Sequence, residues 1–242
     1  LHLSIRRQRQ MCIRDSSYAM IHDMKTPISS AIMCTSRLHS GKLDDKPEIK
    51  NHYFTIVENE LEHLLALSNK VLTLAKLEQH KLEMNKKEVP LSPMIEDLIE
   101  KFTIKTEKTI HFTTDLKTEK VYADEEFLKE AISNLIDNAI KYSKESVKIN
   151  ISSSSDANHD IINIYDNGIG IPQKDQKKIF EKFERASAIK QTRKGGPSGF
   201  GLGLNYVYQV MEAHEGRVYI NSIEGEFSEF SLLIPKIIES YD

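Results

Sequence analysis

Apolar residues recur at intervals of three and four through the first third of the chain. Within residues 18–38 this spacing predicts an amphipathic helix. The polar residues 40–47 then predict a loop, and Pro47 suits the first turn of a following helix. The spacing resumes at Ile49 and predicts a second, longer helix that ends near Glu83.

Two helices joined by a short loop form a hairpin, which needs further partners because each helix buries only one stripe within it. A second copy of the chain supplies these partners by completing a four-helix bundle. We therefore expect residues 17–84 to form an all-helical domain that assembles as a homodimer. Residues 1–16 fit the helical pattern poorly, so we assign them to no domain and leave open whether they are native.

From residue 85 onward, strand-like stretches alternate with helical ones. The expected strands are Thr109–Thr114, Glu119–Tyr122, Val147–Ser152, Ile161–Tyr165, Arg217–Ile223 and Phe227–Ile234. The expected helices are Pro93–Thr106, Glu125–Tyr142, a short one near Gln173–Phe180, and Leu202–Ala213. This alternation predicts an α/β sandwich over residues 85–242, in which one helical layer covers a mixed, mostly antiparallel sheet.

The composition narrows the classes of function. Charged residues make up 29% and hydrophobic residues 39% of the 242 residues, as in ordinary folded proteins. The formal net charge is −3 and no long Lys/Arg tract occurs, which argues against nucleic-acid binding. Cys12 and Cys34 are the only cysteines, which favours a reducing compartment. No run approaches the roughly 18 apolar residues that span a bilayer, so we expect the chain as given to be cytoplasmic.

His22 begins a run of reactive side chains in the first predicted helix. Pro27 removes a backbone hydrogen bond there and loosens the helix beside the imidazole. A neutral imidazole is a good nucleophile near pH 7, and the adjacent Asp23 can orient it and take its proton. Thr26 lies one turn further on and can position a water for the reverse hydrolysis. Taken alone, a histidine near a proline is unremarkable.

The predicted helix near residue 134 carries a polar face. Asn134, Asn138 and Lys141 are spaced by four and three, so they share one side of it. Amide oxygens can ligate Mg²⁺ that bridges nucleotide phosphates, and we expect Asn138 to be that ligand and Lys141 to add charge. An ordinary solvent-facing helix is the alternative, although its polar face would favour Glu and Lys over two aligned Asn.

Asp166 follows the predicted strand Ile161–Tyr165 and is itself followed by Gly168 and Gly170. A carboxylate at this position can accept the exocyclic amine of adenine, whereas guanine presents a carbonyl oxygen there. The arrangement therefore favours ATP over GTP. The glycines permit close backbone approach, although a lone Asp-Asn-Gly is usually only a turn.

Residues 186–198 are mostly polar and predict a mobile lid. Arg185 at its near edge can neutralise phosphate charge, although a solvated surface arginine is an equal alternative without context. Gly199, Gly201 and Gly203 end the stretch and open the next helix, where backbone N–H groups can meet an anion. The remaining histidines, including His39, His63, His80 and His214, lack metal-ligand spacing and read as surface or packing residues.

In their order along the chain, these motifs closely resemble the sensor histidine kinase family over residues 18–236. The matching motifs are His-Asp-x-x-Thr-Pro at 22–27, Asn-x-x-x-Asn-Ala-x-Lys-Tyr at 134–142, Asp-x-Gly-x-Gly-Ile-Pro at 166–172, Phe-x-x-Phe-x-Arg at 180–185 and Gly-x-Gly-Leu-Gly-Leu at 199–204. The resemblance implies a dimerisation and phosphotransfer hairpin at 17–84 and a gyrase-type ATP-binding domain at 85–242. Asp23 replaces a more frequent Glu, and Phe200 stands where a small or hydroxyl residue is frequent.

The resemblance also implies a role for each motif residue. His22 is the phosphoacceptor, Asp23 the base and Thr26 the phosphatase position. The residues implied at the nucleotide are Asn134, Asn138, Lys141, Tyr142, Asp166, Gly168, Gly170, Ile171, Phe183, Arg185, Gly199, Gly201, Leu202 and Gly203. We expect ATP and Mg²⁺ as cofactors, and a response-regulator receiver domain as the partner whose aspartate takes the phosphoryl group. Any membrane anchor, expected in the inner membrane, would precede Leu1.

Two other functions stay open at this point. A gyrase-class ATPase would share the nucleotide site without histidine chemistry, and the Asp-x-x-Thr-Pro context of His22 speaks against it. A catalytically silent dimeric scaffold would retain the motifs without turnover, and nucleotide binding is the observation that tests it.

Overall fold

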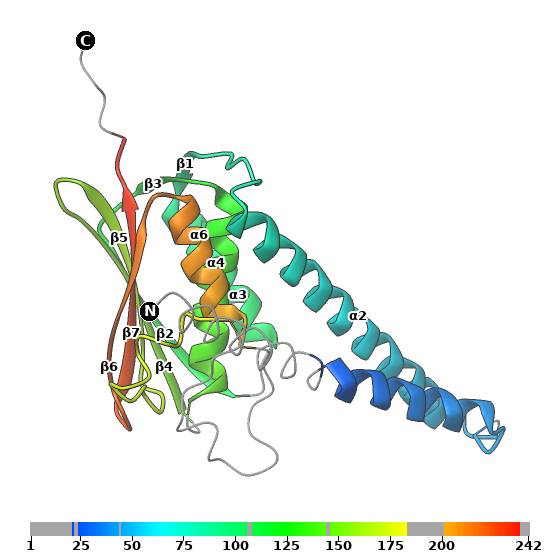
Figure 1. The fold of residues 1–242 in the computed structure, drawn as a ribbon. Helices are drawn as coiled ribbons and strands as arrows, with labels where there is room; N and C mark the ends of the chain where they lie inside the picture. The colour runs from blue at the N-terminus through cyan, green and yellow to red at the C-terminus, as the bar shows by residue number, and fades with distance from the viewer. Residues whose placement is uncertain are drawn as a thin grey trace. The chain divides into compact units, whose positions relative to one another are not determined.

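The computed structural model describes residues 21, 24–43, 45–105, 108–143, 146–182 and 201–237 (Figure 1). The chain divides into two compact units, Leu1–Lys76 and Leu77–Asp242. Within the described ranges, no helix combines the length and the apolar composition that crossing a membrane requires.

The first unit is a helical hairpin. A helix covers residues 24–39, and α2 (Pro47–Glu78) runs back beside it after a short turn (Figure 1). Pro47 is the first residue of α2, as predicted, because a first-turn residue needs no N–H for the helical ladder. The prediction that this helix reaches Glu83 is wrong: α2 ends at Glu78, and His80 has a left-handed backbone with φ of 49°.

The second unit is built on a five-stranded sheet of order β2-β4-β5-β7-β6. The strands are β2 (Thr109–Leu116), β4 (Ser146–Ser155), β5 (His159–Asp166), β6 (Arg217–Ile223) and β7 (Phe227–Pro235). Among the described strands of this sheet, β2 and β4 alone pair in parallel, and the other neighbours are antiparallel. A separate pair joins β1 (Lys87–Pro90) to β3 (Lys120–Ala123). The mixed, mostly antiparallel sheet is confirmed.

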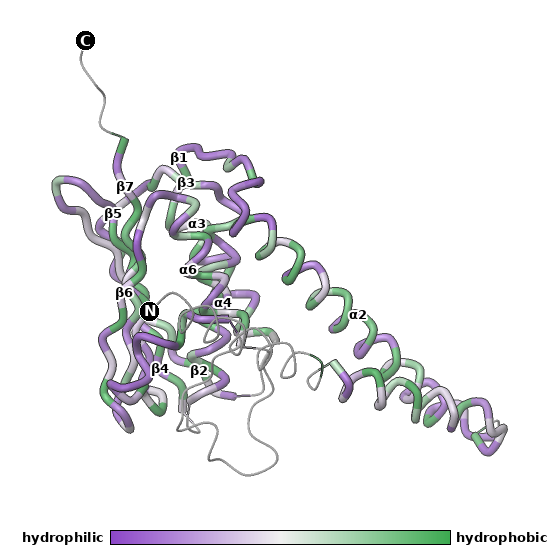
Figure 2. The backbone as a smooth tube through the Cα atoms, in the orientation of Figure 1, coloured by the Kyte–Doolittle hydropathy of each residue, from purple (hydrophilic) through white to green (hydrophobic). Residues whose placement is uncertain are grey.

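One layer of helices covers one face of this sheet, as predicted (Figure 1). It consists of α3 (Leu91–Lys105), α4 (Glu125–Lys141) and α6 (Gly203–Ala213). The core lies between the layers because alternate strand residues, such as Ile149, Ile162 and Ile164, point at the helices and are at most 1% exposed. Apolar and polar residues alternate along these strands in Figure 2.

Most predicted elements of the second unit are present with bounds shifted by one to three residues, and two further details differ from the sequence prediction. Residues 173–180 form successive turns instead of a short helix. The Gln176 side chain donates to the carbonyls of Ile171 (3.0 Å) and Ser222 (2.9 Å), which ties the segment to the end of β6. Strand β1 was not expected, because its four residues include a proline and are too few to display a period.

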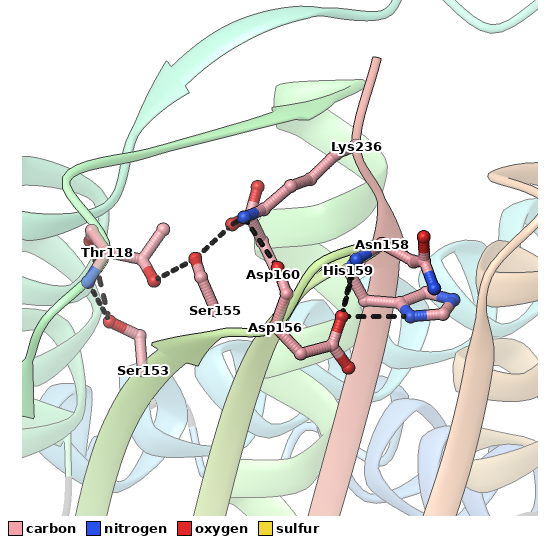
Figure 3. Close-up of polar contacts among 8 residues, drawn as sticks. All are labelled: Thr118, Ser153, Ser155, Asp156, Asn158, His159, Asp160 and Lys236. Carbon is pink, nitrogen blue, oxygen red and sulfur yellow. Dashed lines mark hydrogen bonds and ion pairs between the residues drawn. The ribbon is translucent and has the colours of Figure 1, made fainter. Parts of the chain in front are cut away.

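A polar cluster holds the end of β5 that lies opposite Asp166 (Figure 3). Asp160 is 8% exposed and accepts from Ser155 Oγ, which lies 3.1 Å from Thr118 Oγ1. Lys236 Nζ donates to the Asp156 carbonyl (2.8 Å) and lies 3.8 Å from Asp160 Oδ1. The cluster therefore joins the β4–β5 turn to the β2–β3 connection and to the end of β7.

Candidate active site

Helix α4 carries the first part of the candidate site. Asp124 caps its N-terminus by accepting from the backbone N–H groups of Glu126 (3.2 Å) and Phe127 (3.3 Å). The apolar face of α4 is buried against the core through Leu128, Ala131, Ile132, Leu135, Ile136 and Ala139. This burial fixes the rotation of the helix, so Asn134, Asn138 and Lys141 lie half-buried on another side.

The start of α6 meets these amides. A Cβ atom added to Gly203 would lie 3.2 Å from Asn134 Oδ1 and 3.8 Å from Asn138 Nδ2, so only glycine allows this approach without displacement. The residue before the helix is Leu202, whose apolar side chain cannot cap the first-turn N–H groups. Gly201 has φ of 63°, which turns the chain into the helix. An anion can therefore be bound beside the two amides.

Asp166 ends β5 and provides a buried carboxylate. Asp166 is 7% exposed, and this burial raises the pKa of its carboxyl group to about 6. The Gly168 N–H, which donates to Oδ1 at 2.8 Å, acts in the opposite direction and lowers this pKa. A Cβ on Gly168 would lie 2.5 Å from this Oδ1 and 3.0 Å from the Tyr142 carbonyl oxygen. The carboxylate is thus ionised near pH 7 and able to accept a hydrogen bond from an amine.

The loop after β5 is held between α4 and β6. The Ile169 N–H donates to the Tyr142 carbonyl at 3.1 Å. Gly170 has φ of 64°, and a Cβ atom added to it would lie 1.9 Å from the Ile223 carbonyl oxygen, so there is no room for a side chain. The loop therefore fixes Asp166 relative to the C-terminal end of α4. The sequence-predicted residues gathered here are Tyr142, Asp166, Gly168, Gly170 and Ile171.

Two family models match the chain. Residues 14–80 match the His Kinase A (phospho-acceptor) domain, and residues 123–238 match the histidine kinase-, DNA gyrase B-, and HSP90-like ATPase. The chain belongs to the sensor histidine kinases. The motifs predicted for the nucleotide site lie within the second match, and the predicted phosphoacceptor motif lies within the first.

Relatives and solved structures agree with this assignment. The chain is 30% identical over 237 residues to the adaptive-response sensory kinase SasA of Crocosphaera subtropica, covering 94% of this chain and 61% of that relative. The Acinetobacter baumannii histidine kinase AdeS is similar in structure, with a TM-score of 0.69 at 27% identity over 88% of this chain and 97% of that one. Histidine kinase ThkA in complex with the response regulator TrrA shares the fold, with a TM-score of 0.67 at 24% identity over 97% of this chain and 65% of that one. The kinase chain thus spans less than two thirds of the SasA relative.

Several predicted site residues of the kinase lie outside the described residues. These are His22, Asp23, Phe183, Arg185 and Gly199, together with the predicted lid at 186–198. Thr26 is described and lies exposed on the helix of residues 24–39, followed by the buried Pro27. The expected loosening at Pro27 concerns the Asp23 carbonyl, so it also falls outside the described part.

Two buried side chains near the site were not expected. Asn205 is 5% exposed, and its Nδ2 donates to the Phe180 carbonyl (2.9 Å), which ties the first residue of the Phe-x-x-Phe-x-Arg motif to the first turn of α6. His214 is 3% exposed and contacts the N-cap of α4. The sequence predicts a surface or packing role for His214, and it carries no signal for the partner. Across the part of the chain that the structure describes, no three His, Cys, Asp or Glu side chains converge as a metal-binding cluster would.

Proposed function

We propose that this chain is the catalytic core of a sensor histidine kinase, which phosphorylates His22 from ATP and passes the phosphoryl group to an aspartate of a response regulator. The observation that carries the proposal is the meeting of Gly203 with Asn134 and Asn138, in a chain whose N-terminal part matches a phospho-acceptor domain. In this proposal residues 17–84 are the phosphotransfer domain and residues 85–242 the ATP-binding domain.

The adenine end of ATP is assigned to Asp166. Its carboxylate accepts the exocyclic amine of adenine, and the rigid loop that follows keeps the acceptor in position. Guanine offers a carbonyl oxygen at the same point and would be repelled by the charge. The protein should therefore prefer ATP over GTP, and loss of this preference when the Asp166 carboxylate is removed would support the assignment.

The phosphate end is assigned to the first turn of α6 and to the amides of α4. The side-chain oxygen of Asn138 would hold Mg²⁺, which fits this ion because Mg²⁺ retains most of its waters and takes few protein ligands. When bound, Mg²⁺ supplies neutralisation of the phosphate charge. Lys141 adds a positive charge on the same side of α4, and Arg185 adds another from the segment after Phe180.

The transfer step is an in-line displacement. A ring nitrogen of His22 forms a bond to the γ-phosphorus while the bond to the departing ADP oxygen breaks. Asp23 accepts the proton that the other imidazole nitrogen releases. The phosphoryl group then moves to the regulator aspartate, and Thr26 with Asp23 directs a water in the opposing hydrolysis. ThkA, whose fold this chain shares, was solved with a response regulator protein, which supports this class of partner.

Exposed apolar residues of the hairpin support the homodimer. Each of the two hairpin helices has a second apolar stripe, which is exposed. It is separate from the buried residues Ala31, Cys34, Leu67 and Leu74, and on the first helix it begins with Ile21, just before residues 24–39. Its members are Ile21, Ile28, Ile32, Phe54, Leu61, Leu65 and Leu72, spaced by seven and four within each helix. This is the spacing by which helices pack in a four-helix bundle, and a second copy presents the same stripe.

Incubation with γ-labelled ATP and Mg²⁺ tests the proposed function. We expect label on the protein that is lost in acid, kept in base and absent from His22→Gln. His39→Gln is the matched control, because His39 is an exposed histidine on the helix of residues 24–39. ADP release without protein label in the wild type would instead identify a gyrase-class ATPase.

A further inference from the structure

We propose that His214 is a positioning residue for the nucleotide site, because it ties the C-terminal end of α6 to the N-cap of α4 and so fixes how Gly203 meets the α4 amides. This inference rests on the proposed ATP site. His214 touches neither nucleotide nor phosphate in this proposal, and it acts through the two helices that do.

The contact fixes the tautomer of the imidazole. The Asp124 backbone N–H donates to His214 Nε2 at 2.9 Å, and the Val210 carbonyl lies 2.7 Å from Nδ1. An amide N–H can only donate and a carbonyl can only accept, so Nε2 is unprotonated and Nδ1 carries the hydrogen. The bond between the helices therefore requires a neutral ring.

Each side of this bond is itself held in place. The Asp124 carboxylate accepts from the Asn85 N–H at 2.9 Å in addition to capping α4. On the other side, Gly216 N–H donates to the Met211 carbonyl at 2.8 Å, so the chain closes tightly around the end of α6. Because neither side can yield freely, the bond sets the position of α6 along α4.

The helices run antiparallel and touch at two distant points. Gly203 meets Asn134 and Asn138 at the start of α6, and His214 meets Asp124 at its end. At 1.5 Å per residue these points on α6 lie roughly 16 Å apart. Without the second point α6 can shift along α4, and a misplacement of about 1 Å in an active site can cost on the order of 100-fold. The first-turn N–H groups of α6 would then be offset from the amides.

Protonation should break the same contact. Burial holds the pKa of His214 below its usual value, with Lys86 acting in the same direction and the Val210 carbonyl and Asp124 opposing it. The other charged groups around this end of α6 are Glu212, Glu215, which pairs with Lys86 at 3.0 Å, and Arg217. A proton on Nε2 would face the Asp124 N–H donor. The contact is therefore intact above the unperturbed histidine pKa of about 6.5, and it is lost as the pH falls through the lowered pKa that His214 has in the folded protein.

Three variants of the full chain test the inference. His214→Gln supplies an amide oxygen near Nε2 that does not titrate, whereas His214→Phe keeps ring volume and removes the acceptor. His159→Gln is the control, since His159 lies in the polar cluster at the end of β5 opposite Asp166 (Figure 3). The fluorescent analogue TNP-ATP measures nucleotide affinity at pH 7.5 and pH 5.8, at a temperature where thermal melts show each variant folded.

We expect His214→Phe to bind about 5- to 20-fold more weakly than wild type at pH 7.5, and His214→Gln and the control to bind within about twofold. Wild type should lose more affinity on acidification than His214→Gln, since the titrations of Asp166 and of the nucleotide are common to both. The imidazole ¹⁵N shifts of unliganded wild type should report hydrogen on Nδ1.

Unchanged affinity in folded His214→Phe, or hydrogen on Nε2, would overturn the inference and leave the ATP site standing. Wild type that binds no nucleotide would overturn the proposed function, and the inference with it.

Discussion

Two carboxylates of the ATP-binding domain are equally buried and differ in their partners. Asp124 and Asp166 are each 7% exposed. The Asp124 side chain accepts three backbone N–H groups, from Asn85, Glu126 and Phe127. Asp166 accepts one from Gly168, and its pKa is raised to about 6. A carboxylate that is buried with one donor retains acceptor capacity for a ligand, which is the property that adenine recognition needs.

Replacing Asp166 by Asn should change ATP affinity and the free energy of unfolding in opposite directions. A raised pKa means that the folded state favours the protonated form, so this stabilisation is full below about pH 3.8 and lost as the pH rises through about 6. Asp166→Asn should therefore raise the free energy of unfolding at pH 7.5 by about 1–3 kcal/mol and abolish ATP binding. Urea unfolding and nucleotide titration measure the two effects. The exposed Asp137 on α4 gives the control Asp137→Asn, and destabilisation of Asp166→Asn at pH 7.5 would contradict the assignment.

The two glycines of the site should differ in their tolerance of alanine. At Gly168 a Cβ would meet Asp166 Oδ1 at 2.5 Å and backbone at 3.0 Å, whereas at Gly203 it would meet a side-chain oxygen at 3.2 Å. A side-chain end can move and backbone cannot, so Gly168→Ala should weaken ATP binding at least about tenfold more than Gly203→Ala. Isothermal titration of both variants tests this order, and the reverse order would refute the geometry.

At the scale of elements, the N-cap of α4 is a point where stability can be measured directly. Asp124→Ala removes acceptors from three backbone N–H groups and should lower the free energy of unfolding by about 1–3 kcal/mol. Glu125→Ala removes the ion pair with Lys87 (2.7 Å), in which both side chains are about half exposed, and should lower the free energy of unfolding by clearly less than Asp124→Ala does. Equal losses in urea unfolding would show that the cap contributes nothing beyond surface charge.

The predictability of each element depends on where its hydrogen bonds go. Strand β6 has the predicted bounds, Arg217–Ile223, because alternation and backbone pairing both stop at the turn that follows. The sequence predicts a helix at 173–180, where the structure has turns. The Gln176 side chain there donates hydrogen bonds to the carbonyls of Ile171 and Ser222, and no local sequence pattern indicates such bonds. The shared face of Asn134 and Asn138 follows from helical periodicity alone. The bond from Asp124 to His214 joins residues 90 positions apart, which a single sequence does not reveal.

At the scale of the whole molecule, a substitution in the exposed apolar stripe of the hairpin should change dimer formation without changing nucleotide binding. Leu61→Glu adds a charge to that stripe, where Leu61 is 54% exposed, and should convert a dimer into monomers. Light scattering should report the change, while ATP affinity stays within about twofold because the site lies within the second unit. Glu58→Gln, at an exposed position of the same helix, is the control. A dimeric Leu61→Glu variant would refute the assignment of this stripe.

The single parallel pair of the sheet governs the order in which the ATP-binding domain can fold. Hairpins β4–β5 and β6–β7 join neighbours in sequence and can form early, since closing short loops costs little entropy. Strand β2 can pair with β4 only after the chain has crossed through β3 and α4, because parallel strands need such a crossover. Because α4 lies within this crossover, we expect the helix that carries the amides to dock in the same late step that closes the sheet edge. A chain in which β2 does not pair with β4 would retain its two hairpins but would not bind nucleotide.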